Sequence, residues 1–126
     1  MYIGIDFDGT LVRHKYPLVG EEVPGAVKVC HDLMAAGHSL ILWTMRSGVQ
    51  LQDVVNWCEA RSIKLYGINE NPSQVVWTTS PKAYANLYID DSALGVPLKR
   101  DGDDVFVDWR YVREYLEVTG YLNKPQ

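Results

Sequence analysis

The chain has 126 residues, of which 47% are apolar and 22% charged, and 12 Lys and Arg against 16 Asp and Glu give a net charge of −4. This length excludes two domains, and the composition excludes the low hydrophobicity and high net charge of a disordered chain. The small negative charge argues against general nucleic-acid binding, which needs a basic face for the phosphate backbone. We expect residues 1–126 to form a single globular domain with a polar tail at 123–126.

The N-terminal sequence MYIGIDFDGT lacks the basic stretch, the long apolar stretch and the cleavage site of a signal peptide. No apolar run approaches the roughly 18–20 residues needed to cross a bilayer. The two cysteines, Cys30 and Cys58, have no CxxC spacing, so we expect reduced, packed thiols rather than a disulfide or a zinc site. These features predict a cytoplasmic protein that does not bind membranes.

In chain order, the first predicted element is a short apolar strand at residues 2–5 that ends at Asp6. Residues 11–23 lack helical periodicity and predict a loop or short hairpin, and Pro24 then begins a helix that ends near Gly37. The remaining segments are a strand at 39–43, a helix at 50–60, a strand at 64–68, strands at 87–89 and 105–107, and a helical pattern at 111–116. Residues 69–80 have no clear pattern.

The alternation of strands and helices predicts the fold class. Strands that alternate with helices form right-handed βαβ crossovers. The near-continuous apolar run SLILW at 39–43 is typical of a parallel strand that is covered on both faces. We therefore expect an α/β, Rossmann-like, doubly wound and mostly parallel sheet of five strands with helices on both faces.

Polar side chains stand where three of the predicted strands end. They are Asp6 and Asp8, Thr44 and Arg46, and Asp90 and Asp91. In such sheets ligands bind beyond the carboxyl ends of the strands, so four carboxylates would meet at one edge, with Lys82 close to it. Crowded carboxylates repel unless a cation neutralises them, and oxygen ligands without a His or Cys cluster favour Mg²⁺.

Taken singly, these residues have ordinary structural explanations. The dipeptide Asp8-Gly9 is a common turn sequence, and Asp90-Asp91 could cap a helix or a turn. An EF-hand is excluded because Thr10, Leu11 and Pro17 occupy positions where that calcium loop needs other residues. The placement of several acids at successive strand ends favours a functional site, because a fold gains nothing from crowding them.

Four segments resemble, in order, the motifs of the haloacid dehalogenase superfamily of phosphatases. They are Asp6-Phe7-Asp8-Gly9-Thr10, Thr44 after SLILW, Lys82, and Tyr88-Ile89-Asp90-Asp91. The resemblance extends from residue 1 to about residue 95. It implies a fold like that of this superfamily without a cap domain, because neither 11–43 nor 45–81 is long enough to hold one. Residues 11–23 would then be the only local flap.

The resemblance also implies roles for single residues. Asp6 would be the nucleophile and a metal ligand, and Asp8 the general acid/base, whose backbone carbonyl also contacts the metal. Thr44 would hydrogen-bond the transferring phosphoryl group, and Lys82 would neutralise its charge. These four residues form the predicted catalytic set.

The other predicted site residues bind the metal or the substrate. Asp90 and Asp91 would hold Mg²⁺, with Asp91 as the direct ligand. The candidate substrate-binding residues are Gly9, Thr10 and Arg46, with Arg13, His14 and Lys15 of the flap as further contacts. The tryptophans Trp43, Trp57, Trp77 and Trp109 are expected in the core or at an interface rather than as stacking surfaces.

The sequence therefore predicts a Mg²⁺-dependent phosphohydrolase that cleaves phosphate monoesters through an aspartyl-phosphate intermediate. The substrate would be a phosphorylated small metabolite or the phosphorylated end of a polymer. A second copy of the chain could cover the open site through exposed aromatics such as Tyr16 or Trp77. The alternatives are a phosphotransferase or mutase that uses the same intermediate, and a non-catalytic phosphate-binding or receiver-like switch domain.

Overall fold

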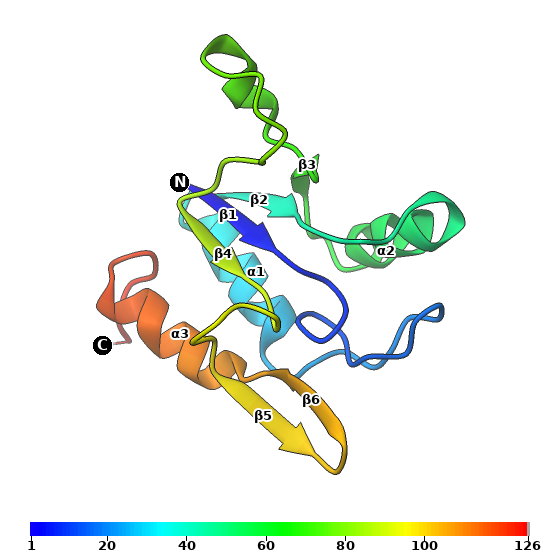
Figure 1. The fold of residues 1–126 in the computed structure, drawn as a ribbon. Coiled ribbons are helices and arrows are strands. Elements are labelled where there is room, and N and C mark those ends of the chain that lie inside the picture. The colour runs from blue at the N-terminus through cyan, green and yellow to red at the C-terminus, as the bar shows by residue number, and fades with distance from the viewer. Residues whose placement is uncertain (126) are drawn as a thin grey trace.

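The computed structural model describes residues 1–125, and its centre is a four-stranded parallel sheet (Figure 1). Its strands are β1 (Tyr2–Ile5), β2 (Ser39–Leu42), β3 (Leu65–Ile68) and β4 (Leu87–Ile89), in the spatial order β3-β2-β1-β4. In the middle of the sheet, Ile3 of β1 is level with Leu40 of β2 and Leu87 of β4. The carboxyl ends of β1, β2 and β4 therefore meet at one edge, as the sequence predicts.

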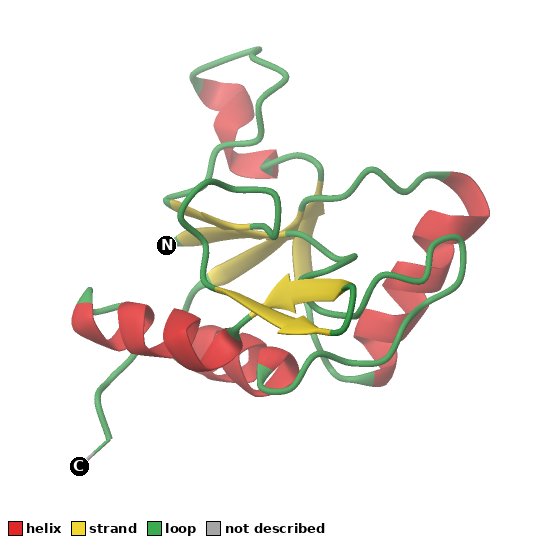
Figure 2. Ribbon diagram, turned by 60° about the horizontal axis from the view of Figure 1, so that its bottom comes forward, coloured by secondary structure: helices red, strands yellow, loops and turns green. Residues whose placement is uncertain are grey.

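Three α-helices of the described chain lie on one face of the sheet (Figure 2). They are α1 (Ala26–Ala35), α2 (Gly48–Ala60) and α3 (Trp109–Val118). Successive side chains of a strand point to opposite faces, and Ile3, Ile5 and Leu42 belong to one core cluster with apolar residues of all three helices. Within this core, Cys30 and Cys58 are buried thiols, and burial raises the pKa of both. None of the helices in residues 1–125 has the length and apolar character needed to pass through a membrane.

The opposite face of the sheet is covered by residues 69–86, which include the short 3-10 helix η1 (Pro72–Val76) (Figure 2). A Cβ atom on Gly4 of β1 would lie 2.9 Å from Cδ1 of Tyr88 on the neighbouring strand β4 and 3.6 Å from Cβ of Ala85 in the cover, so only a residue without a side chain fits here without a shift of its neighbours. We predicted helices on both faces of the sheet. On this face the described chain has only the short 3-10 helix η1. Residues 69–80, which have no periodic pattern, are the first part of this cover.

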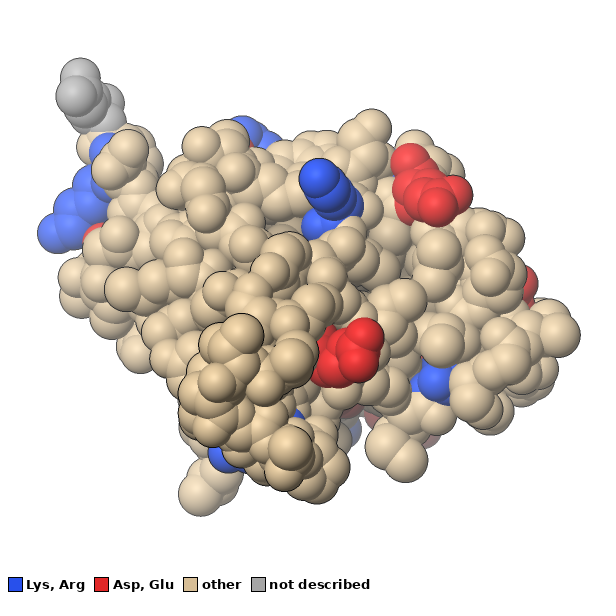
Figure 3. All heavy atoms as spheres, turned by 90° about the horizontal axis from the view of Figure 1, so that it is seen from above, with Lys and Arg blue, Asp and Glu red and all other residues tan. Residues whose placement is uncertain are grey.

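The η1 segment carries exposed apolar side chains. Val75, Val76 and Trp77 are 71%, 88% and 64% exposed. The η1 segment stands at the top of the molecule in Figure 1, and Figure 3 shows the molecule from that side. This face is largely uncharged, and its charged residues are scattered. This is apolar surface that the predicted contact with a second copy would use.

The predicted fifth strand does not join the parallel sheet. In the described chain β6 (Asp104–Val107) pairs antiparallel with β5 (Leu98–Asp101) in a separate hairpin. The predicted strand is β6, and the chain between β4 and β6 includes β5, which pairs with β6 as a hairpin. Only residues 90–97 remain before this hairpin, which is too few for the crossover helix that a strand parallel to β4 needs. The prediction of a five-stranded sheet was wrong for this reason.

Residues 11–23 fold back as an irregular hairpin next to the end of β1, and we call them the flap. Val12 bridges both Asp8 and Glu22, and the backbone N–H of Val23 donates to the carbonyl of Leu11 at 2.9 Å. Arg13 ties the flap to the β5–β6 hairpin, with its Nε 2.5 Å from Oδ2 of Asp104. Between β1 and β3 the described chain contains the flap, α1, β2 and α2.

Candidate functional site

A cleft of about 630 Å³ opens at the carboxyl ends of β1, β2 and β4. Four aspartates line it, namely Asp6, Asp8, Asp90 and Asp91. Its apolar lining residues, here called the apolar side, are Trp43, Met45 and Pro81, and Thr44, Asn69, His14 and Ser92 also line the cleft. Its volume lies in the range of about 300–1,000 Å³ that is typical of small-molecule sites.

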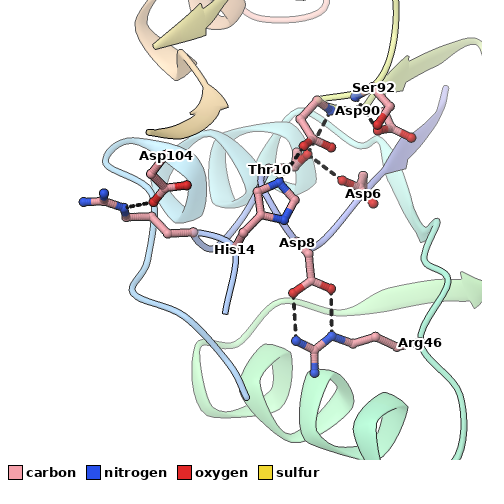
Figure 4. Close-up of polar contacts among 10 residues, drawn as sticks. Asp6, Asp8, Thr10, His14, Arg46, Asp90, Ser92 and Asp104 are labelled. Carbon is pink, nitrogen blue, oxygen red and sulfur yellow. Dashed lines mark hydrogen bonds and ion pairs between the residues drawn. The ribbon is translucent and has the colours of Figure 1, made fainter. Parts of the chain in front are cut away.

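The side chains of Asp6, Asp90 and Asp91, here called the acidic triad, lie close together within this cleft. One ligand oxygen from each lies within 4.8 Å of the other two. Figure 4 shows Asp6 and Asp90 of this group beside Thr10. The backbone N–H of Asp6 donates to the carbonyl of Ile89 at 2.9 Å, which continues the β1–β4 pairing past the strand ends. The sheet itself therefore brings residues 6 and 90 together.

Thr10 holds two members of the acidic triad in place. Its hydroxyl donates to Oδ2 of Asp6 at 2.8 Å and accepts from the backbone N–H of Asp91 at 3.2 Å. The Thr10 side chain is fully buried. The Thr10 side chain therefore orients Asp6 and Asp91 from the protein interior. Thr10 is not among the residues that line the cleft.

Gly9 permits a close approach beside the acidic triad. Its φ is +80°, and a Cβ atom at this position would collide with Nε2 of His14 and Oδ2 of Asp91. These two side-chain atoms are 2.8 Å apart, so His14 from the flap orients Asp91. Gly9 and Thr10, both predicted as substrate-binding residues, are thus buried beneath the site.

The electrostatics of the acidic triad favour proton or cation binding. Burial raises the pKa of Asp6 to about 8, Asp90 and Asp91 reinforce the shift, and the Thr10 hydrogen bond opposes it. Burial also raises the pKa of Asp90, whose carboxylate accepts the backbone N–H of Ser92 at 2.9 Å. A divalent cation would relieve the same repulsion that the proton relieves.

The thermal stability of the protein in EDTA is expected to fall as the pH rises from about 5 to about 8. The folded protein keeps a proton on Asp6 up to a pKa of about 8, whereas the ordinary pKa of this side chain, which applies to the unfolded chain, is 3.8. Between these values the folded state binds more protons, so a rising pH favours unfolding. Melting curves of the wild type and Asp6→Asn test this, because the slope should be flatter in the variant. Equal slopes would contradict it.

Asp8 points away from the acidic triad toward Arg46 (Figure 4). Nε of Arg46 donates to Oδ2 of Asp8 at 2.8 Å, and Nη2 donates to Oδ1 at 2.7 Å. Two parallel bonds of this kind make the strongest form of ion pair, and Asp8 raises the pKa of Arg46 further. A metal contact from Asp8 would have to come from its backbone carbonyl, as the resemblance implies.

The remaining N–H groups of Arg46 hold the flap. Nη2 donates to the carbonyl of Leu18 at 2.7 Å, and Nη1 donates to the carbonyls of Pro17 and Gln50 at 3.3 and 3.5 Å. Its guanidinium carbon also lies 5.1 Å from the ring centre of Tyr16. Because its side chain is only 1% exposed and every N–H is engaged, Arg46 does not offer a donor to substrate in this conformation.

Thr44 is fixed by Asn69, a residue that the sequence analysis missed. The backbone N–H of Thr44 donates to Oδ1 of Asn69, and Nδ2 of Asn69 donates to the Thr44 carbonyl, each at 2.8 Å. Asn69 has a φ of +55°, and an asparagine directly after a strand is the signal for this conformation. The Thr44 hydroxyl accepts the backbone N–H of Arg46 at 3.1 Å, which leaves its proton free to donate.

Lys82 lies next to the cleft rather than in its wall. Its neighbour Pro81 lines the cleft, whereas Nζ of Lys82 lies 5.6 Å from the ring centre of Tyr88. Within residues 1–125 its amine has no carboxylate at ion-pair distance. Lys82 is exposed, so its long side chain is not fixed by the core.

This architecture has a counterpart among solved structures. The chain is similar to a conserved protein coded by a locus from Bacteroides thetaiotaomicron, with 37% identity over 95% of this chain and 90% of that chain, and a TM-score of 0.76. The two chains belong to the same family. A scan of family models and a search of curated proteins gave no match.

Proposed function

We propose that this chain is a Mg²⁺-dependent phosphohydrolase that cleaves phosphate monoesters, with a mechanism like that of the haloacid dehalogenase superfamily. The observation that carries the proposal is the acidic triad, with one oxygen of each residue within 4.8 Å of the others. Octahedral ligands of Mg²⁺ at about 2.1 Å are about 3.0 Å apart when adjacent and about 4.2 Å apart when opposite, so small side-chain movements would bring these oxygens around one ion.

In the first step Asp6 attacks phosphorus. The Thr10 hydroxyl binds Oδ2 of Asp6, which leaves Oδ1 for the attack. A bond forms between this oxygen and phosphorus while the ester bond breaks, and the leaving oxygen takes a proton from Asp8. Bound Mg²⁺ would offset the repulsion between the carboxylate and the phosphoryl group. The product is an alcohol and an aspartyl-phosphate.

In the second step water cleaves the aspartyl-phosphate. Asp8, now ionised, accepts a proton as water attacks, and Asp6 is released as a carboxylate. The two hydrogen bonds from Arg46 fix the orientation of the Asp8 carboxylate for this step. In the first step the leaving oxygen must replace one Arg46 contact. The Thr44 hydroxyl would donate to the phosphoryl oxygens, and Lys82 would extend past Pro81 to neutralise their charge.

Phosphate release from a panel of monoesters tests the proposal. The purified protein with Mg²⁺ is expected to release inorganic phosphate from several esters, and Asp6→Asn is expected to release none. Addition of sugar acceptors separates the alternatives, because transfer to an acceptor would indicate a phosphotransferase. An aspartyl-phosphate that persists without turnover would indicate a receiver-like switch, and no phosphate release from any ester would count against the hydrolase.

Removal of the metal is expected to abolish activity. EDTA should eliminate phosphate release and Mg²⁺ should restore it. Without a cation, the carboxylates of the acidic triad repel a phosphate dianion and prevent it from binding. Ca²⁺ should inhibit, since it takes more ligands at longer distances than Mg²⁺. Initial rates in titrations of each ion measure this. Full activity in EDTA after extensive dialysis would contradict it.

A further inference from the structure

We infer that the cleft takes phosphate monoesters whose leaving group carries a planar apolar ring, and that Trp43 and Met45 bind this ring. The inference rests on the proposed function, because it names the substrate class of the same site. Trp43 and Met45 stand on either side of Thr44 in the chain, and all three line the cleft. A group attached to a phosphoryl held by Thr44 would therefore contact the apolar side.

Trp43 and Met45, on the apolar side of the cleft, both keep surface that is exposed to solvent. The ring of Trp43 is half-buried and lies against Tyr88, with the ring centres 6.5 Å apart, so one side of it is supported by the sheet. Met45 is 98% exposed although its neighbours Thr44 and Arg46 are buried. An exposed methionine contributes little to folding, whereas its flexible thioether adapts to flat apolar ligands. This arrangement fits a ring that completes the contact.

The charge of the cleft excludes a second anionic group on the substrate. Four aspartates line it, and no lysine or arginine does so in the part of the chain that the structure describes. The donors of Arg46 are engaged by Asp8 and the flap, and Lys82 is assigned to the transferring phosphoryl group. A bisphosphate or a carboxylated ester would leave its second charge facing aspartates without a counter-ion.

The polar groups of the cleft also disfavour a polyhydroxylated leaving group. The side-chain amide of Asn69 is engaged at both ends with the backbone of Thr44. Met45 and Pro81 offer no hydrogen-bond donor to a sugar hydroxyl. Hydroxyls that are buried against this side would lose hydrogen bonds to water without gaining others, which costs free energy. An apolar ring has no such hydrogen bonds to lose.

Benzyl phosphate and glycerol 1-phosphate test the inference, because each releases an alcohol at a CH₂–O bond, and the rest of the leaving group is an aromatic ring in one and a short chain with two hydroxyls in the other. The wild type is expected to show a kcat/KM about 10-fold higher for benzyl phosphate. Fructose 1,6-bisphosphate and glucose 6-phosphate should be poorer than both. Equal kcat/KM values for benzyl phosphate and glycerol 1-phosphate would overturn the inference while leaving the hydrolase proposal intact.

Three variants test whether Trp43 and Met45 cause the preference for benzyl phosphate. Met45→Ala and Trp43→Leu are expected to raise KM for benzyl phosphate several-fold, with a smaller effect on glycerol 1-phosphate. Trp77→Leu is the matched control, since Trp77 is 64% exposed and does not line the cleft. Because Met45 is almost fully exposed, its replacement leaves the fold unaffected even if Trp43→Leu does not fold. An equal effect of Met45→Ala on both esters would overturn the inference.

A binding measurement keeps the inference separate from the proposed function. Calorimetric titration in Mg²⁺ compares benzylphosphonate with methylphosphonate, neither of which has an ester bond to cleave. Tighter binding of benzylphosphonate that Met45→Ala weakens would support the ring site even in a protein that releases no phosphate. Equal affinities for the two phosphonates would overturn it.

Discussion

Replacement of Asp6 by asparagine is expected to abolish phosphate release and to leave the protein folded. An amide neither attacks phosphorus nor binds Mg²⁺ well, and loss of a nucleophile lowers kcat on the order of 10⁶-fold where it has been measured. The asparagine carbonyl can still accept the Thr10 hydroxyl that now binds Oδ2. Replacement also removes a carboxylate whose pKa burial raises to about 8, so the fold loses a source of repulsion.

The measurement pairs initial rates with a thermal melt. Asp103→Asn is the matched control, because Asp103 is exposed between β5 and β6 and the same chemical change occurs away from the cleft. It should keep wild-type rates. A folded Asp6→Asn protein with activity near that of the wild type would exclude Asp6 as the nucleophile.

The parts of the site that the sequence predicts are those that depend on local patterns. Short apolar runs locate β1, β2 and β4, and in a parallel sheet the residues after such strands must lie at the same edge. The meeting of Asp6 with Asp90 and Asp91 follows from this rule, because the backbone pairing of β1 with β4 continues to Asp6. Local apolar patterns therefore carry information about a contact between residues far apart in the chain.

The missed features depend on contacts that no local pattern specifies. β5 has the sequence LKRD and is exposed along its whole length, so it lacks the alternation of a half-buried strand. Its existence depends on pairing with β6 and on the Arg13 bonds to Asp101 and Asp104. The absence of that strand from the prediction also placed residues 105–107 in the wrong sheet.

Arg46 illustrates the same limit within the site. A cation close behind a strand end suggests contact with a phosphorylated substrate, and this is how the sequence analysis interpreted it. Its direction is decided by Asp8 and by the carbonyls of Pro17 and Leu18, which reach it only because the flap folds back. A charged side chain that is 1% exposed must satisfy its donors within the protein, and Arg46 does so.

Replacement of Arg46 by methionine is therefore expected to be the most destabilising single change at the site. Methionine can keep the packing against Tyr16 and Phe7, but it leaves the Asp8 carboxylate and the flap carbonyls without their donors. Breaking a buried ion pair on one side costs about 3–5 kcal/mol. The lower end is expected, since the side chain of Asp8 is 19% exposed and water can solvate it in part. Urea unfolding measures the loss.

A half-exposed ion pair provides the control for this prediction. Arg61 pairs with Glu22 at 3.2 Å, with side chains 33% and 44% exposed, so Arg61→Met should cost about 1 kcal/mol or less. Adding Asp8→Asn to Arg46→Met should recover part of the loss, because the unpaired charge is then removed. Amide hydrogen exchange in the flap should accelerate much more in Arg46→Met than in the control, in which only the half-exposed contact with Glu22 of the flap is lost. If the two arginine variants lose equal stability, the ion pair with Asp8 does not hold the flap to the site.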